Sequence, residues 1–501
     1  MQEVYLECAR ATRVGTVVRG YSHQCTTMEA DMRWIALCWL GLCLTALNAQ
    51  TVRDAINLAN QGKTQEAIEA FEALYQRDEN NPTVVSWLGY LYLKVGKYAE
   101  AVPMLEKATR LTPRNAEAWN NLGNAYLHTG QLEKAINAYG KALEIRPNDA
   151  DAHYNLGNLY SKTRQYQKAV EHYQKAIQLN PRDANAHNNL GYTYQMMKLP
   201  SRALPHYKRA LELEPNNATF RYNYGLVLAE LGQWQEAVAN LEQAMRQMPN
   251  EVAGWLKLGE AYTRLRQPEK AIEALQKGIA ANPNNPDLHY NLGVAHLQRG
   301  NLAAAATAFE QVLNLRPDDA DALNQLGFVQ LRQRRYDDAV ATLRRALELN
   351  PRLLSARLNL ATAYRLKGDR ENALRLYRQV VEADPKNLDA RLALGDVLLE
   401  QGDLAGAEAQ YRAVLRENER THAAWNNLGL ILMRTNRTQE AIRALERAVA
   451  LNPKSAVYRN NLGAAYERAG QIAKARTLYQ EALQLDPNFE DARKNLERLK
   501  R

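Results

Sequence analysis

The sequence predicts an all-α protein built of stacked antiparallel helix pairs, an α-solenoid. Three observations predict it: a 34-residue period covers residues 48–489 without an insertion or deletion, apolar residues recur within each period at helical spacing, and helix-forming residues dominate the composition. Hydrophobic residues make up 46% of the 501 residues, enough to bury a continuous core. We therefore expect an array of small units and no conventional globular domains.

Thirteen blocks of 34 residues cover residues 48–489, and three places in the block hardly vary. Alanine stands at the twentieth place of all thirteen blocks, from Ala67 to Ala475, while glycine at the eighth place and proline at the thirty-second each recur in eleven. The departures are Ala55 and Ala361 at the eighth place and Glu79 and Glu419 at the thirty-second. Each block is therefore one structural unit.

Each block contains two helical patterns. Apolar residues occupy places 4, 7, 8 and 11 in the first half and places 20, 24 and 27 in the second, and each set lies on one face of an α-helix. In residues 116–149 these places hold Trp119, Leu122, Gly123, Tyr126, Ala135, Tyr139 and Ala142. Small residues at places 8 and 20 let the two helices approach closely. One pair cannot bury both of its faces, so neighbouring pairs must stack.

Turn residues separate the predicted helices. Glycine often stands at place 15, where a helix end favours a left-handed conformation; examples are Gly96, Gly130, Gly232, Gly300 and Gly470. Proline at place 32 ends the second helix. Pro103 and Pro205 fall inside second helices, at place 22, and are expected to bend or loosen them.

The two ends of the array depart from the pattern. The first block has Asp54 where leucine is usual, which suits a terminal repeat. At the other end, residues 490–501 begin a further first helix with Leu496 and Leu499 directed inward and charged residues outward. We expect this segment to be a solvating cap.

Residues 32–49 resemble a signal peptide. Arg33 precedes an apolar run of 14 residues, shorter than the roughly 20 that span a bilayer. We expect cleavage after Ala46 or Ala49, export to a periplasmic or other extracytoplasmic space, and no stable membrane span. An uncleaved anchor or a disordered tail on a cytoplasmic protein is the alternative.

The first 31 residues show no helical period and no motif. We expect residues 1–31 to be either disordered or untranslated, with translation beginning at Met28 or Met32. All four cysteines lie in the first 43 residues, at Cys8, Cys25, Cys38 and Cys43. No disulfide framework can therefore hold the repeats together.

The formal net charge is +9, and the basic excess is concentrated in residues 331–380, which contain twelve Lys or Arg against five Asp or Glu. A basic stretch of this kind favours acidic partners by electrostatic steering. No nucleic-acid-binding motif or paired aromatic platform accompanies it, so nucleic-acid binding is not expected.

The places, the spacing and the copy number resemble the tetratricopeptide repeat family over residues 48–489. The resemblance implies a right-handed superhelix whose first helices line a concave wall, as in the repeat arm of O-linked N-acetylglucosamine transferases. The sixth place of the block, on that wall, is asparagine in eight blocks and Gln325 in a ninth. The asparagines are Asn121, Asn155, Asn189, Asn223, Asn291, Asn359, Asn427 and Asn461.

A row of side-chain amides offers donors and acceptors that can pair with the backbone of an extended peptide. Alternatively, these amides bond a neighbouring helix and set the rotation between repeats. Other groove residues are expected at places 5, 9, 12 and 13, where they either contact the partner or seal the seam between repeats. They include Tyr154, Tyr222, Tyr290, Tyr192, Phe328, Lys94, Arg332 and Arg365. No Lys-x-x-x-Asn stands at the inward places, so the carboxylate clamp of chaperone-binding relatives is not expected.

Enzyme motifs are missing from the sequence: no GxxxxGK[ST], G-x-S-x-G, HExxH or CxxC pattern occurs. We expect no catalytic residue, no cofactor and no metal site. His153, His187 and His289 stand at place 4, where other blocks have tryptophan, so packing explains them. His172 and His206 stand on successive pairs about 10 Å apart, too far to share one ion.

The sequence thus predicts a non-catalytic scaffold that binds proteins or extended peptides on the concave face of its repeats. The alternative is a substrate-recruiting or assembly subunit of a separate enzyme or of a secretion, pilus or glycosyltransferase machine. A lone enzyme is a third hypothesis that the missing motifs oppose. The partner and the oligomeric state are not predicted.

Overall fold

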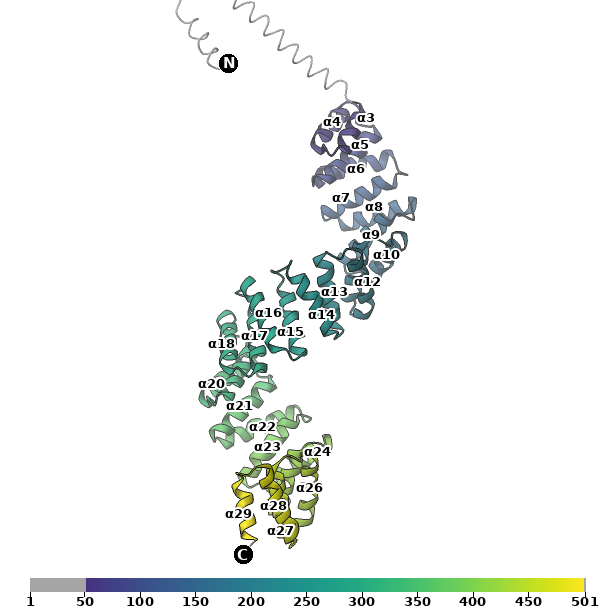
Figure 1. The fold of residues 1–501 in the computed structure, drawn as a ribbon. Helices are drawn as coiled ribbons and strands as arrows, with labels where there is room; N and C mark the ends of the chain where they lie inside the picture. Colours follow the sequence, from purple (N-terminus) through teal and green to yellow (C-terminus); the bar gives the residue numbers. More distant parts are fainter. Residues whose placement is uncertain (1–50, 500–501) are drawn as a thin grey trace, which may run out of the picture. The chain divides into compact units, whose positions relative to one another are not determined.

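The computed structural model describes residues 51–499, and all regular structure within them is α-helical (Figure 1). The expectations for residues 1–31 and 32–49, including the four cysteines and the signal-like segment, concern residues outside this range. No helix of residues 51–499 has the length and apolar character needed to cross a bilayer. The described residues form two units, divided within one helix after Val227.

The helices alternate between the first and second halves of the blocks, and we call them A and B helices. The A helices are α3 (Val52–Asn60), α5 (Pro82–Lys94), α7 (Ala116–His128), α9 (Ala150–Lys162), α11 (Ala184–Met196), α13 (Ala218–Glu230), α15 (Val252–Arg264), α17 (Pro286–Arg299), α19 (Ala320–Arg332), α21 (Leu354–Lys367), α23 (Leu388–Gln401), α25 (His422–Arg434) and α27 (Ala456–Arg468). The B helices are α4 (Thr64–Arg77), α6 (Tyr98–Leu111), α8 (Leu132–Ile145), α10 (Tyr166–Leu179), α12 (Pro200–Leu213), α14 (Trp234–Met245), α16 (Pro268–Ala281), α18 (Leu302–Leu315), α20 (Tyr336–Leu349), α22 (Arg370–Ala383), α24 (Leu404–Glu417), α26 (Thr438–Leu451) and α28 (Ile472–Leu485), and α29 (Glu490–Arg498) follows.

Helix packing within each unit is that of an α-solenoid, which confirms the predicted fold class. An A helix packs against the B helix of its own repeat, and that B helix packs against the A helix of the next repeat, as α5, α6 and α7 do. Each repeat therefore shares its hydrophobic core with its neighbours, so no single pair is a separate domain.

The eighth place of the block is small because a side chain from the B helix crosses it. A Cβ atom on Gly123 would lie 2.6 Å from the ring of Tyr139, which is fully buried. In the second unit, a Cβ on Gly463 would lie 2.7 Å from the ring of Tyr479. A residue larger than alanine, which stands there at Ala55 and Ala361, would push the two helices of a repeat apart.

Place 15 has a positive φ in all thirteen repeats, including the five that lack glycine there. Eight repeats carry glycine, which adopts this conformation without strain. The other five carry Arg164, Lys198, Arg266, Arg334 and Asn436, with φ between 56° and 63°. The geometry of the A-to-B turn, and not the residue, therefore decides the backbone conformation.

In ten of the thirteen repeats the fourth place carries a tryptophan, histidine or arginine whose side-chain N–H reaches the backbone carbonyl six residues earlier; the exceptions are Thr51, Val85 and Leu323. Trp119 Nε1 donates to the Pro113 carbonyl oxygen at 3.0 Å, and Arg391 Nε donates to that of Pro385 at 2.6 Å. The same bond is made by His153, His187, Arg221, Trp255, His289, Arg357, Trp425, Arg459 and Arg493. Histidine at place 4 thus replaces tryptophan as a hydrogen-bond donor as well as in packing.

The unusual residues of the sequence fit into this framework. The helices α6 and α12 continue without a break through Pro103 and Pro205. Because α3 starts at Val52, the place that leucine usually holds lies in the first turn of this helix. Asp54, which stands there, forms a capping box with Thr51. At the other end, Leu496 and Leu499 of the last segment pack against the cluster that contains Tyr479.

Candidate functional site

The A helices form the inner layer of each unit. Consecutive A helices contact one another directly, as α5 with α7 and α9 with α11 in the first unit and α15 with α17 and α19 with α21 in the second. No comparable contact joins consecutive B helices within residues 51–499. The surface between neighbouring A helices is therefore the inner surface of each unit, and we call it the groove.

Most sixth-place amides, half-buried in the groove, donate to the preceding repeat. The usual acceptor is an asparagine at place 5: Asn223 Nδ2 donates to Asn188 Oδ1 at 2.9 Å, and Asn461 Nδ2 donates to Asn426 Oδ1 at 2.9 Å. Equivalent bonds are made by Asn155 to Asn120 and by Asn359 to Asn324. These bonds join successive A helices, as the packing alternative for the amide row expects.

A second arrangement uses place 9 of the preceding repeat. Asn189 Nδ2 donates to Asn158 Oδ1 at 2.9 Å and to the Tyr154 hydroxyl at 3.2 Å. Asn427 Nδ2 donates to Asp396 Oδ1 at 3.0 Å and to the Tyr411 hydroxyl at 3.3 Å. The sixth-place amide therefore finds a hydrogen-bond acceptor in the preceding repeat at either place 5 or place 9.

Two other amides of the row have different partners. Asn291 Nδ2 donates to the Asp287 carbonyl of its own helix at 2.8 Å, and Gln325 Nε2 donates to the Tyr290 hydroxyl at 3.4 Å. Asn121 lies in a cleft beside Trp87. Contact of the amide row with a peptide stays a prediction.

The fifth-place acceptors were not anticipated from the sequence. The signal for them is the Asn-Asn dipeptide at 120–121, 188–189, 426–427 and 460–461. In each dipeptide the second asparagine stands at the donor place and the first at the acceptor place for the following repeat. In the last of these, Asn460 accepts from Asn495 of α29 at 2.9 Å.

Open clefts lie between neighbouring A helices, and two of them are lined by the same places of the block. Each has a volume of about 640 Å³. One is lined by Asn158, Ser161, Lys162, Asn189, Tyr192 and Met196, and the other by Glu260, Thr263, Arg264, Asn291, Val294 and Gln298. The sixth-place side chain thus lines a cleft that recurs along the repeats, and in most repeats it also donates a hydrogen bond to the adjacent helix.

The other expected groove residues lie in varied environments. Tyr192 is 47% exposed in the first of these clefts. Lys94 and Arg332 are exposed, and the Arg332 guanidinium lies 5.9 Å from the ring centre of Phe328. Tyr222 is partly buried in α13.

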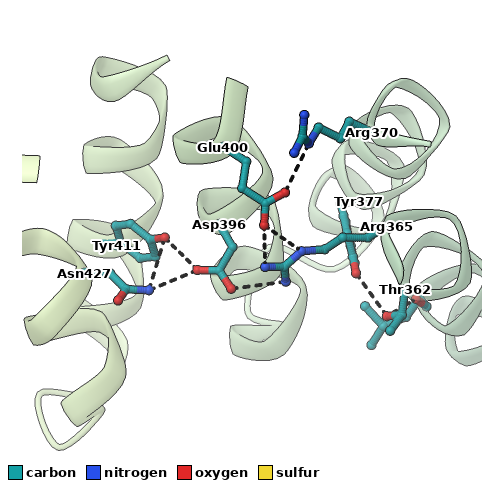
Figure 2. A network of polar contacts seen from close by, with 9 residues as sticks. Thr362, Arg365, Arg370, Tyr377, Asp396, Glu400, Tyr411 and Asn427 are labelled. Carbon is teal, nitrogen blue, oxygen red and sulfur yellow. Dashed lines mark hydrogen bonds and ion pairs between the residues drawn. The ribbon is translucent and has the colours of Figure 1, made fainter. Parts of the chain in front are cut away.

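Arg365 is held by carboxylates of the next repeat instead of being free for a partner (Figure 2). Its Nη1 lies 3.2 Å from Asp396 Oδ2 and its Nη2 lies 2.8 Å from Glu400 Oε1. The Tyr411 hydroxyl donates to the same Asp396 at 2.7 Å. Burial and the bond to Asp396 raise the pKa of Tyr411, so its hydroxyl stays protonated and remains a donor.

Further cations of residues 331–380 also have carboxylate neighbours. Arg345 pairs with Asp318 at 2.9 Å, and Lys367 pairs with Asp337 at 2.5 Å. Exposed ion pairs of this kind contribute little stability, but they reduce the positive potential that the charge count implies. Preference for an acidic partner here stays a prediction, with a weaker basis than the sequence offered.

Comparison with known families identifies the type of repeat. Tetratricopeptide repeat models match residues 123–163, 150–183, 184–217, 206–239, 392–456 and 426–490. The solved structure of MamA is 30% identical over 33% of this chain and 96% of its own, with a TM-score of 0.31. The chain belongs to the tetratricopeptide repeat family.

Two other family models and two further solved structures also match parts of the chain. The C-terminal domain model of cilia and flagella-associated protein 70 matches residues 239–422, and the model of anaphase-promoting complex subunit 3 matches residues 60–142. YrrB, described as a TPR protein with an unusual peptide-binding site, is 29% identical over 37% of this chain and 95% of its own, with a TM-score of 0.35. A tetratricopeptide repeat protein from Parabacteroides merdae is 19% identical over 50% of this chain and 98% of its own, with a TM-score of 0.42.

None of the curated proteins matches the chain. The likeness to the repeat arm of O-linked N-acetylglucosamine transferases stays a resemblance of sequence pattern. Tetratricopeptide repeats are generally non-catalytic protein-interaction modules, and they make up the described part of this chain.

Proposed function

We propose that this protein is a non-catalytic scaffold that binds an extended segment of a partner protein along the groove of its A helices. The observation that carries the proposal is the recurrent cleft, lined by the same places of the block in α9 and α11 and in α15 and α17. An open cleft that repeats along a stack suits a polymer, because each cleft can take one part of a long ligand.

The chemistry of the cleft suits a peptide. Neighbouring A helices lie roughly 8–10 Å apart, and an extended chain advances roughly 3.3 Å per residue, so one cleft corresponds to about three peptide residues. Asn189 supplies a polar group, while the exposed Tyr192 and Met196 supply contact area for side chains. The amide recurs from cleft to cleft, whereas the neighbouring side chains vary. A long peptide can therefore be bound in several clefts, each with its own preference for peptide side chains.

Photo-crosslinking tests this assignment. A photoreactive amino acid at Tyr192 lies in the groove, whereas the same group at Leu111, exposed at the end of the B helix α6, lies outside it. We expect the groove position, and not the control, to form adducts with one contiguous segment of a partner protein. Equal adducts from both positions would overturn the proposal.

Affinity measurements on the captured segment provide the second test. The double substitution Tyr192→Ala and Met196→Ala should weaken binding about tenfold or more, because aromatic groove residues carry much of the energy at such interfaces. Leu111→Ala, which also removes an exposed apolar side chain, should leave the affinity unchanged. Circular dichroism would verify that all variants keep their helix content.

We also propose that residues 32–49 direct export. The support is the apolar run that follows Arg33. N-terminal sequencing of the protein from its native source should find a start after Ala46 or Ala49. A native protein that retains residues 34–47 would contradict a cleaved signal.

A further inference from the structure

Two consecutive repeats each contain a pair of histidines in contact. His153 of α9 and His172 of α10 have their Nδ1 atoms 3.0 Å apart, and His187 of α11 and His206 of α12 have theirs 3.5 Å apart. Each pair joins place 4 of the A helix to place 23 of the B helix. Sequence spacing had led us to consider only His172 with His206, from different repeats, and to reject them as too far apart to share an ion; the contacts that the fold makes lie within each repeat.

A backbone hydrogen bond sets the protonation of the first histidine in each pair. His153 Nε2 lies 3.1 Å from the Pro147 carbonyl oxygen, and His187 Nε2 lies 3.3 Å from that of Pro181. A carbonyl oxygen only accepts, so Nε2 carries the proton and Nδ1 of the neutral ring keeps its lone pair. The Nδ1 lone pair of the first histidine therefore accepts the Nδ1–H of the second. An ion can replace that proton once the second imidazole carries its proton on Nε2 instead.

An aromatic ring holds the second histidine of each pair in place. Tyr160 stacks on His172 with ring centres 5.4 Å apart, and Tyr194 stacks on His206 with ring centres 5.7 Å apart. Burial lowers the pKa of both histidines, and that of His206 falls to about 4. The stacked tyrosine therefore keeps the second imidazole beside the first.

The spacing of the nitrogens matches shared coordination of an ion. Two imidazole nitrogens at the usual roughly 2.0–2.1 Å from a metal are about 2.9 Å apart when they subtend a right angle and about 3.4 Å apart in a tetrahedron. The observed separations of 3.0 and 3.5 Å fall close to these values. We propose that each pair binds one late transition-metal dication, such as Cu²⁺, Ni²⁺ or Zn²⁺, through its two Nδ1 atoms.

Each proposed site has two protein ligands, and water completes the coordination. No group of three or more His, Cys, Asp or Glu that could hold an ion occurs in residues 51–499. Charges of both signs lie near the pairs, and Glu171 lies near His172. Asp149 and Lys175 act on His153 with opposite sign, and Asp183 and Arg209 do the same at His187. Exchangeable binding, weaker than that of a structural zinc site, follows from this ligand set.

The rest of the array shows that the fold does not need the second histidine. His289 makes the same bond to the Pro283 carbonyl at 2.8 Å, yet place 23 of its repeat is Ala308. Alanine also stands at place 23 in four further repeats, at Ala70, Ala138, Ala274 and Ala444. Replacing His172 or His206 by alanine therefore introduces a residue that this position already accepts, and His289 is a matched control without a partner.

Titration with Cu²⁺ tests the proposal on the full chain, with its four cysteines alkylated so that they do not bind the ion. By calorimetry, the wild-type chain should bind two more ions than the double variant His172→Ala/His206→Ala, and each single variant should lose one. His289→Trp, which keeps the place-4 donor, should bind as many ions as the wild type. Equal stoichiometry and affinity in the wild type and the double variant would overturn the proposal.

Two further measurements separate ion binding from a change in folding. Electron paramagnetic resonance of the bound Cu²⁺ should show two nitrogen ligands in the wild type, and this signal should vanish in the double variant. Zn²⁺ should raise the melting temperature of the wild type and not that of the double variant, because an ion that binds only the native state stabilises it. A wild-type spectrum without nitrogen coupling would contradict ligation by the imidazoles.

Discussion

Two repeat junctions, one in each unit, use the same geometry with different charge. Between the fourth and fifth repeats, Tyr173 donates to Asn158 at 2.7 Å and Asn189 donates to the same oxygen at 2.9 Å. Between the eleventh and twelfth repeats, Tyr411 donates to Asp396 at 2.7 Å and Asn427 donates to the same oxygen at 3.0 Å. The acceptor at place 9 is a neutral amide in the first junction and a carboxylate in the second.

The carboxylate requires a counter-ion that the amide does not. Arg365, from the tenth repeat, supplies it by reaching Asp396 and Glu400 of the eleventh (Figure 2). The neutral junction thus couples two repeats, whereas the charged one couples three. In both junctions the residue at place 9 accepts hydrogen bonds from its own repeat and from the next one. The charge of this residue decides whether a third repeat joins the contact.

Removing the counter-ion should have the largest effect on the charged junction. Arg365→Ala leaves the partly buried Asp396 without a cation, while Glu400 keeps its longer pair with Arg370, and we expect the free energy of unfolding to fall by about 2 kcal/mol. Arg332→Ala, at an exposed arginine that packs on Phe328, is the control and should cost less than about 1 kcal/mol. Equal losses in urea unfolding would show that the ion pair contributes nothing specific.

Making the neutral junction charged should also destabilise it. Asn158→Asp places a carboxylate beside the Tyr173 and Asn189 donors, but place 12 of the preceding repeat is Leu127 and provides no cation. We expect a loss of about 1 kcal/mol, because the cation one turn along the same helix, Lys162, is exposed and compensates a half-buried carboxylate only weakly. Asp396→Asn, the reverse change, should cost less in the same assay, and a larger cost would mean that the two junctions are not equivalent.

The amide row can be separated into packing and binding contributions. Asn189→Ala removes bonds to the preceding repeat and should lower stability by about 1 kcal/mol. Asn291 donates only within its own helix, so Asn291→Ala should change stability by less than about 0.5 kcal/mol. Both side chains line a cleft. If Asn291→Ala weakens partner binding at unchanged stability, the amide contacts the partner; unchanged affinity would leave packing as its role.

Acid should affect α9 to α12 at higher pH than α27 to α29. Burial lowers the pKa of His153, His172, His187 and His206 in the folded protein. Below the unfolded pKa of about 6.5 the unfolded chain therefore binds more protons, and stability falls as the pH drops towards about 4. In the second unit, the Arg498 guanidinium holds the pKa of Glu467 below its ordinary value, so stability there is lost as the pH falls through the lower carboxylate range.

Hydrogen exchange measured from pH 7 to pH 4 would resolve the two responses. Amides of α9 to α12 should lose protection first, and those of α27 to α29 later. Simultaneous loss throughout the chain would contradict the difference. The double variant His172→Ala/His206→Ala should reduce the early loss, since it removes two of the four buried imidazoles.

The sequence by itself determined the helix pairs and the contact between them. The period of 34 and the helical spacing within each half, both local along the chain, predict that small residues at places 8 and 20 bring the two helices close together. The structure adds that the ring of Tyr139, at place 24, lies against Gly123. The groove positions were placed on the A helices because of the resemblance to the tetratricopeptide repeat family. The left-handed turn was predicted only in repeats that have glycine at place 15. Arg164 and Arg334 adopt it as well, because the geometry of the turn overrides the preference of the residue.

Only the tertiary structure decided which side chains meet across repeats. Asn223 bonds place 5 of the preceding repeat while Asn189 bonds places 5 and 9, and both stand at the same place in the block. Arg365 pairs with carboxylates 31 and 35 residues further along the chain. Each histidine pair joins residues that are 19 apart and lie on the two helices of one repeat. These contacts depend on the rotation and distance between packed helices. Many side chains together set that rotation, so no local pattern in the sequence reveals it.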